Sequence, residues 1–163
     1  MGTANIAALS LSNCRVIDVE RVEDNESLVS LLKQSGTFLV YPSQTSCEMS
    51  SLTQPESSIK QLVFLDGTWR KTRRLYFESP LMQSLPAVHF ENLQGRYRIR
   101  KAKEQNAVST LEAVTHALTL LEPEKDFKSI LKTMDWMIDR QIEAMGDEVY
   151  KYNYLNEKDL TKQ

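Results

Sequence analysis

Asp66 is the first residue whose type and position suggest chemistry. It directly follows an apolar run, residues 61–65, of the kind that forms buried strands in parallel sheets, and Gly67 then starts a turn into a helix. Ligands of open α/β sheets bind beyond the carboxyl ends of the strands, so a carboxylate here can orient a substrate or act as a general base. It can equally cap the helix through the amide of Thr68 or Trp69. The two roles conflict, because hydrogen bonds from helix amides lower the pKa of an aspartate and weaken it as a base.

The indole of Trp69 stands at the same turn. It can stack on an adenine or a flipped base, although core packing is the usual arrangement for a single Trp on the apolar side of a helix. Projection of residues 69–77 on a helix places Thr72, Leu75 and Tyr76 on that apolar side with Trp69. The opposite arc is wholly basic and consists of Arg70, Lys71, Arg73 and Arg74.

A second basic segment lies at residues 95–103 and contains Arg96, Arg98, Arg100, Lys101 and Lys103. If it is extended, its three alternate arginines share one face, where they bind phosphates or carboxylates, or protect an edge strand from aggregation. Residues 66–103 carry nine basic and three acidic side chains, a charge of +6, whereas the remainder carries -8 and the whole chain -2. Phosphates respond to the local field, so the pattern favours a polyanionic partner over a merely solvated charged face.

The elements that must position these residues alternate between strands and helices. Strands are predicted at residues 15–19, 37–41, 61–65 and 87–90, with 61–65 at the centre of the sheet. Helices are predicted at residues 26–34, 69–77, 79–85, 109–122 and 124–145, and a surface loop at 44–58. Ser109 and Glu112 form a capping box, which by itself explains Glu112. The predicted fold class is α/β, a mainly parallel sheet with helices on both faces, in a single domain at residues 1–146 followed by a loosely ordered polar tail at 147–163.

The sequence argues against several common classes of protein. It contains no GxGxxG, Walker, HExxH or GxSxG motif. With 2 Cys and 2 His, a four-ligand metal site is hard to assemble, so no metal is predicted, and Cys14 and Cys47 are expected to be reduced thiols of a cytosolic protein. No apolar run approaches the roughly 18 residues of a membrane span, and no export or lipidation signal is present. We therefore expect a cytoplasmic protein without membrane association.

Several short motifs occur in a specific order. Leu65-Asp66-Gly67-Thr68-Trp69, with Arg70 and Leu75, is followed by Tyr97-x-x-Arg100 and then by Ser109-Thr110-Leu111-Glu112-Ala113, and Leu39-Val40-Tyr41-Pro42-Ser43 lies upstream. Over residues 3–122 this order resembles the DTW-domain family, named for its D-x-T-W motif. The resemblance implies a tRNA-uridine aminocarboxypropyltransferase of the EC 2.5.1 class. Such an enzyme uses S-adenosylmethionine (SAM) to place a 3-amino-3-carboxypropyl group on N3 of a uridine and releases methylthioadenosine. A SPOUT-like, trefoil-knotted SAM site is implied as well, an exception to the general absence of knots.

The same resemblance implies roles for individual residues. Asp66 would take the proton from N3 of the uridine. The SAM contacts would come from Tyr41, Pro42, Ser43, Leu65, Thr68, Trp69, Ser109, Thr110 and Glu112. The tRNA phosphates would be held by Arg70, Lys71, Arg73, Arg74, Arg96, Arg98, Arg100, Lys101 and Lys103. Many members of the family carry a cysteine cluster, expected to bind zinc, ahead of this domain; the present sequence has none there.

Two other functions fit the same residues. The first is a SAM-dependent RNA methyltransferase, because SPOUT-like folds mostly transfer methyl groups. The second is an RNA-binding module without catalytic activity, which would need the basic face but no SAM site. The nucleoside product released from SAM distinguishes the two transferases, and SAM binding distinguishes both from the binding module.

Overall fold

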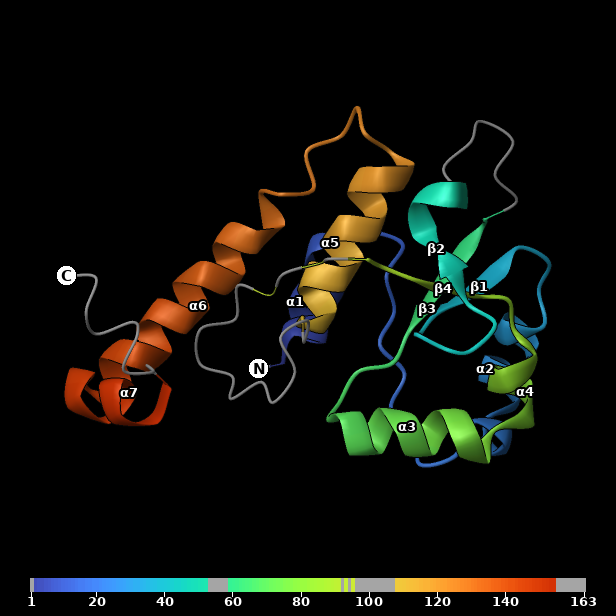
Figure 1. Cartoon of the computed structure of the whole chain (residues 1–163), viewed down its shortest axis with the longest axis horizontal. Helices are drawn as coiled ribbons and strands as arrows, with labels where there is room; N and C mark the ends of the chain where they lie inside the picture. The colour runs from blue at the N-terminus through green and yellow to red at the C-terminus, as the bar shows by residue number, and fades with distance from the viewer. Residues whose placement is uncertain (1, 53–58, 92, 94, 96–107, 155–163) are drawn as a thin grey trace. The chain divides into compact units, whose positions relative to one another are not determined.

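A computed structural model of the chain describes residues 2–52, 59–91, 93, 95 and 108–154 (Figure 1). The chain forms two compact units. The sheet unit comprises Leu11–Glu91, and the helical unit comprises Met1–Ser10 together with Asn92–Gln163. None of the described helices combines the length and the apolar character that a membrane span requires.

The sheet unit contains a 4-stranded sheet in the order β2-β4-β1-β3. Its strands, all parallel, are β1 (Thr37–Val40), β2 (Cys47–Glu48), β3 (Gln61–Phe64) and β4 (Ala87–His89). Val40 lies beside Phe64 of β3 and beside Val88 of β4, so the carboxyl ends of these strands meet at one edge of the sheet. The predicted α/β class with a parallel sheet is confirmed.

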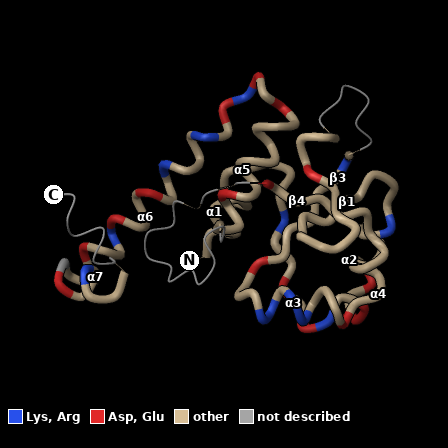
Figure 2. Tube along the Cα trace, viewed as in Figure 1, with Lys and Arg blue, Asp and Glu red and all other residues tan. Residues whose placement is uncertain are grey.

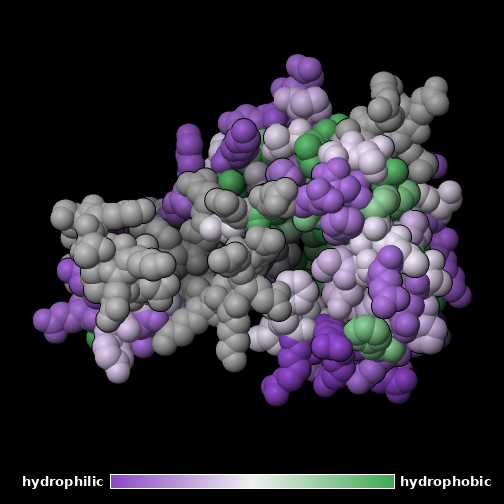
Figure 3. Space-filling model, viewed as in Figure 1, coloured by the Kyte–Doolittle hydropathy of each residue, from purple (hydrophilic) through white to green (hydrophobic). Residues whose placement is uncertain are grey.

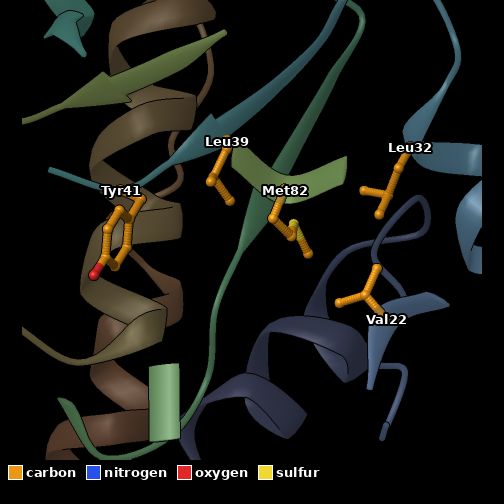
Figure 4. Packing of buried hydrophobic residues seen from close by; sticks show 5 residues of the cluster. All are labelled: Val22, Leu32, Leu39, Tyr41 and Met82. Carbon is orange, nitrogen blue, oxygen red and sulfur yellow. The ribbon is translucent and has the colours of Figure 1, made fainter. Parts of the chain in front are cut away.

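Helices cover the face of the sheet to which Leu39 points. The helical elements of this unit are η1 (Val22–Asp24), α2 (Glu26–Leu32), η2 (Met49–Leu52), α3 (Trp69–Glu78) and α4 (Pro80–Ser84). In the core, Leu39 and Tyr41 meet Val22 of η1, Leu32 of α2 and Met82 of α4 (Figure 4). Leu39 and Tyr41 are two residues apart, so they share a face of the extended chain. Complete burial of a leucine-sized side chain stabilises the fold by roughly 1.5 to 3 kcal/mol.

Polar caps fix the helices that lie on this face. Asn25 accepts a hydrogen bond from the Leu28 amide at 2.9 Å and begins α2. The buried Ser79 hydroxyl accepts from the Met82 amide at 3.1 Å and donates to Glu23 Oε1 at 2.6 Å. The bond from Ser79 lowers the pKa of Glu23 and joins α4 to η1.

The helical unit consists of α1 (Thr3–Ser10), α5 (Thr110–Leu121), α6 (Ile130–Met145) and α7 (Asp147–Tyr154). Helix α1 packs on both α5 and α6. Ile6, Leu111, Met134 and Ile138 are buried. The apolar residues whose spacing predicts α5 and the later part of α6 are therefore buried in the core of this unit, as expected.

Two predictions about strands are wrong. Residues 15–19 form no strand, and Val16 and Ile17 remain 49% and 39% exposed, so their apolar side chains do not face a core. Strand β3 lies at one end of the described sheet, not at its centre, and each of its residues is partly exposed.

The polar segments contain more regular structure than predicted. The predicted loop at 44–58 includes β2 and η2, and Met49 is fully buried there. Helix α6 begins at Ile130 instead of residue 124, because the Asp126 carboxylate accepts from the Ser129 amide and favours a local turn. The predicted loose tail begins with α7, which follows the positive φ of Gly146 and stacks Tyr150 on Tyr154.

Candidate active site

The carboxyl edge of the sheet brings two groups of predicted site residues together. Because Val40 pairs in register with Phe64, the residues that follow β1 and β3 leave the sheet at the same level. The Tyr41 amide also donates to the Val88 carbonyl at 2.9 Å, which extends the pairing of β1 with β4. The residues placed at this edge are Tyr41, Pro42 and Ser43 after β1, and Leu65, Asp66, Thr68 and Trp69 after β3.

Thr68 caps the helix that leaves this edge. Its hydroxyl accepts from the Lys71 amide at 3.3 Å, and its carbonyl accepts from the Thr72 amide at 2.9 Å. The N-cap position of α3 therefore belongs to Thr68 and not to Asp66, which is exposed and lies two residues before the cap. The cap of α3 therefore does not account for Asp66.

The turn depends on Gly67, whose φ is 146°. A residue with a side chain rarely adopts this φ, so Gly67→Ala is expected to destabilise the sheet unit by about 1 to 3 kcal/mol. Steric contact adds little, since the new Cβ would lie 3.4 Å from Lys71 Cδ. Urea unfolding measures the change, with Gly2→Ala as the control because Gly2 has open space around it. Equal stability of the two variants would show that the turn accepts a side chain.

Tyr41 is held between the sheet and α3. Its ring is 9% exposed and stacks on Tyr76, with centroids 4.4 Å apart and an angle of 23° between planes. Burial raises the pKa of Tyr41, although the charge of Arg73 opposes the shift. Tyr41 is therefore an uncharged phenol at neutral pH, and its ring fixes the start of the loop that follows β1.

Trp69 is 46% exposed, so the expectation that it packs in the core is wrong. It is the first residue of α3, where the helix starts at the sheet edge. Thr72, Leu75 and Tyr76 provide the packing side that the sequence predicts, and all three are less exposed than Trp69. The indole consequently has surface available for a planar ligand.

The sequence did not predict the hydrogen bond between Ser46 and His89 at this edge of the sheet. Ser46 Oγ lies 3.0 Å from His89 Nδ1 at the end of β4. The same hydroxyl donates to the Ser43 carbonyl at 2.8 Å and accepts from the Ser43 amide at 3.1 Å. The loop that contains Ser43 is thus attached to β4. The available signal was His89 itself, a polar residue at the carboxyl end of a predicted strand.

The remaining predicted cofactor residues lie in the helical unit, at the start of α5. The Ser109 amide donates to Glu112 Oε2 at 2.7 Å, and the Glu112 amide donates to Ser109 Oγ at 3.3 Å, which confirms the predicted capping box. The Ser109 hydroxyl also lies 3.4 Å from Met134 Sδ. Ser109 and Glu112 are 3% and 5% exposed, while Thr110 is partly exposed. Their contacts with SAM stay a prediction.

Basic side chains gather on α3, which Figures 2 and 3 show as a charged and strongly hydrophilic helix. Arg70, Lys71, Arg73 and Arg74 are all exposed. Arg74 is bound to Glu20 at 2.8 Å and lies 3.7 Å from Glu78. In the part of the chain that the structure describes, the other three have no ion pair. The second predicted basic group, Arg96, Arg98, Arg100, Lys101 and Lys103, lies outside the described residues.

No cluster of three or more His, Cys, Asp or Glu side chains suited to a metal ion occurs within the described ranges. Both cysteines are unbridged. Cys14 is partly buried, which raises the pKa of its thiol, and Cys47 is exposed. Neither thiol belongs to the group of residues that follows β3.

The residues at the sheet edge offer a ligand both an aromatic surface and hydroxyl groups. The aromatic surface is the half-exposed indole of Trp69. The hydroxyls of Ser43 and Thr68 offer polar contacts at loop positions that the Ser46 bonds and the α3 cap hold in place. Apolar side chains with a few fixed polar groups are typical of cofactor sites.

The chain thus places an Asp-Gly-Thr-Trp turn at the carboxyl edge of a parallel sheet. The family model of the DTW domain matches residues 1–142, and the chain is therefore a member of the DTW domain family.

Two curated relatives carry a more particular name. The chain is 28% identical over 109 residues to tRNA-uridine aminocarboxypropyltransferase 2 of Drosophila melanogaster, across 66% of this chain and 43% of the relative. It is 24% identical over 120 residues to the protein of the same name from Macaca fascicularis, across 71% of this chain and 40% of the relative. The chain thus spans less than half the length of these relatives. No solved structure matches it significantly.

Proposed function

We propose that the chain transfers the 3-amino-3-carboxypropyl group of SAM to N3 of a uridine in tRNA and releases methylthioadenosine. The observation that carries this proposal is the exposed Asp66 beside the half-exposed Trp69 at the carboxyl edge of the sheet. The names of the relatives support the choice of reaction.

Asp66 is assigned to the proton on N3 of the uridine. Its carboxylate lies on a turn that Gly67 and the Thr68 cap hold rigidly, so it can stay in place while the uridine enters. When bound, SAM supplies the electrophile, which is the methylene carbon of its aminocarboxypropyl chain next to the sulfonium, and the electrons of the broken carbon–sulfur bond remain on the sulfur of methylthioadenosine. Loss of the N3 proton to Asp66 leaves the nitrogen lone pair to form the new bond. General-base catalysis of this kind contributes typically about 10² to 10⁴-fold to a rate.

Positioning supports the transfer of the larger group. SAM carries several electrophilic carbons, so the enzyme must direct the methylene carbon and not the methyl group toward N3. Trp69 on the adenine, with the hydroxyls of Ser43 and Thr68 on polar atoms of SAM, would fix that direction. The loop of Ser43 is attached to β4 through Ser46 and His89, which reduces the motion that would spoil the alignment.

The parallel sheet and the family membership support a further proposal, that the SAM site is of the SPOUT-like, knotted kind. A crystal structure of the chain with methylthioadenosine tests it directly. The path of residues 92–108 relative to the loop after β1 would be visible in such a structure. An unknotted path would contradict the proposal without affecting the assignment of the reaction.

The nucleoside product of SAM tests the proposed reaction. Purified chain is incubated with total tRNA and SAM, and the products are separated by chromatography with mass detection. We expect methylthioadenosine and a uridine heavier by the aminocarboxypropyl group. S-adenosylhomocysteine with a methylated nucleoside would instead identify a methyltransferase, and tRNA binding without SAM binding would identify an RNA-binding module.

A further inference from the structure

The exposed side of α3 carries aromatic and basic side chains in one row. Trp69, Arg73 and Phe77 follow one another at intervals of four residues, so they lie along the same side of the helix. Trp69 is 46% and Phe77 58% exposed, and Arg73 between them is also exposed. Two exposed aromatic rings with an exposed cation between them form a small patch that can contact a ligand.

The ring of Phe77 is supported from two sides. Its edge meets Tyr76, with centroids 5.2 Å apart and an angle of 79° between planes. The Arg73 guanidinium lies 5.5 Å from the Phe77 centroid. Tyr76 in turn stacks on the buried Tyr41. Phe77 is therefore a surface residue whose ring has a defined orientation before any ligand binds.

The charges beside the row divide into two kinds. Arg74 is bound by Glu20 and Glu78, so its charge is largely compensated. Arg73, Arg70 and Lys71 have no ion pair among the described residues. A row that combines an oriented ring with uncompensated cations is complementary to a ligand with both planar and anionic groups.

We propose that this row binds unpaired nucleotides of RNA, with a base stacked on Phe77 and the phosphates next to it held by Arg73 and Arg70. An RNA duplex offers phosphates but keeps its bases stacked inside, so it cannot use the ring. An acidic peptide would use the cations alone. The inference deepens the proposed function by naming the kind of tRNA segment that α3 recognises, and it rests on that function only for the identity of the RNA.

The position of the ring also places the contact relative to the site. Phe77 lies eight positions after Trp69, a distance of about 12 Å along the helix axis. A base stacked on Phe77 therefore belongs to a nucleotide close to the uridine at Asp66. The modified uridine and the nucleotide on Phe77 would therefore lie in one single-stranded segment.

Fluorescence anisotropy of the full chain with a labelled single-stranded RNA of about 12 nucleotides tests the proposal. Phe77→Ala is expected to weaken binding about 5- to 100-fold without changing the salt dependence, because stacking involves no counterion release. Phe77→Tyr keeps the ring and should bind within about twofold of the original chain. Arg73→Ala should weaken binding and lower the slope of log K against log salt by about 0.7. Lys33→Ala is the matched control, because it removes an exposed cation at the end of α2 in the same unit, and it should leave the slope unchanged.

Three results would overturn the proposal. The first is an unchanged affinity of Phe77→Ala for the single-stranded RNA. The second is equal affinity of the original chain for a hairpin duplex and for the single strand. The third is an acidic peptide that displaces the RNA equally well from the original chain and from Phe77→Ala. The thermal midpoints of the variants identify any loss of folding. If Phe77→Ala unfolds, Phe77→Tyr still tests the proposal, because it retains the ring. Since the assay contains no SAM, these results are independent of methylthioadenosine formation. The RNA surface and the proposed reaction can therefore fail separately.

Discussion

Asp66→Asn is expected to reduce the rate of methylthioadenosine formation with tRNA by at least about 100-fold, the lower end of what a general base contributes. The amide has the shape of the carboxylate but cannot accept the N3 proton. Folding should be preserved, because Thr68 and not Asp66 caps α3. Initial rates, the tRNA dissociation constant and the thermal midpoint are measured together, and only the rate is expected to change.

Asp24→Asn provides the matched control, since it removes an exposed carboxylate of the same unit from η1. It should retain full activity. A variant at Asp66 that unfolds would show that the turn depends on this carboxylate for its structure. A stable Asp66→Asn enzyme with an unchanged rate would require a different base for N3.

Glu112→Ala is expected to lower the free energy of unfolding by about 2 to 4 kcal/mol, since it combines a lost helix cap with a buried unpaired amide. Glu112 is 5% exposed, and its carboxylate accepts from the Ser109 amide at 2.7 Å. Glu112→Gln retains an acceptor oxygen and should lose less. Urea unfolding curves provide the measurement.

Glu124→Ala is the control for this prediction, because Glu124 is an exposed carboxylate in the segment after α5. Its free energy of unfolding should change by no more than about 0.5 kcal/mol. Calorimetric titration with SAM separates the two roles of Glu112. Normal stability of Glu112→Ala with loss of SAM binding would show that the carboxylate serves the cofactor first.

Local patterns predicted much of this fold. The spacing of Leu28, Leu31 and Leu32 predicts α2, and the Ser109 and Glu112 pair predicts the capping box that begins α5. The Asp66 turn lies at the carboxyl end of a strand as expected. These features depend on residues a few positions apart, whose interactions the sequence displays directly.

Features that depend on distant residues were not predictable in the same way. The edge position of β3 follows from the order of the strands, which apolar content alone does not specify. The bond between Ser46 and His89 joins residues 43 positions apart. Trp69 is exposed because the cap places it at the first position of α3, ahead of the side chains that pack on the sheet. Each of these outcomes is decided by tertiary contacts.

The two units differ in whether they are formed by one continuous stretch of the chain or by two separate stretches. The sheet unit is one continuous stretch, whereas the helical unit joins α1, from the beginning of the chain, to α5 and α6 beyond the sheet. During synthesis the sheet unit is therefore complete before α5 exists, while α1 has to wait for its partners. Helix α1 thus reaches its packing partners only after α5 and α6 have been made, although it precedes the sheet unit in the sequence.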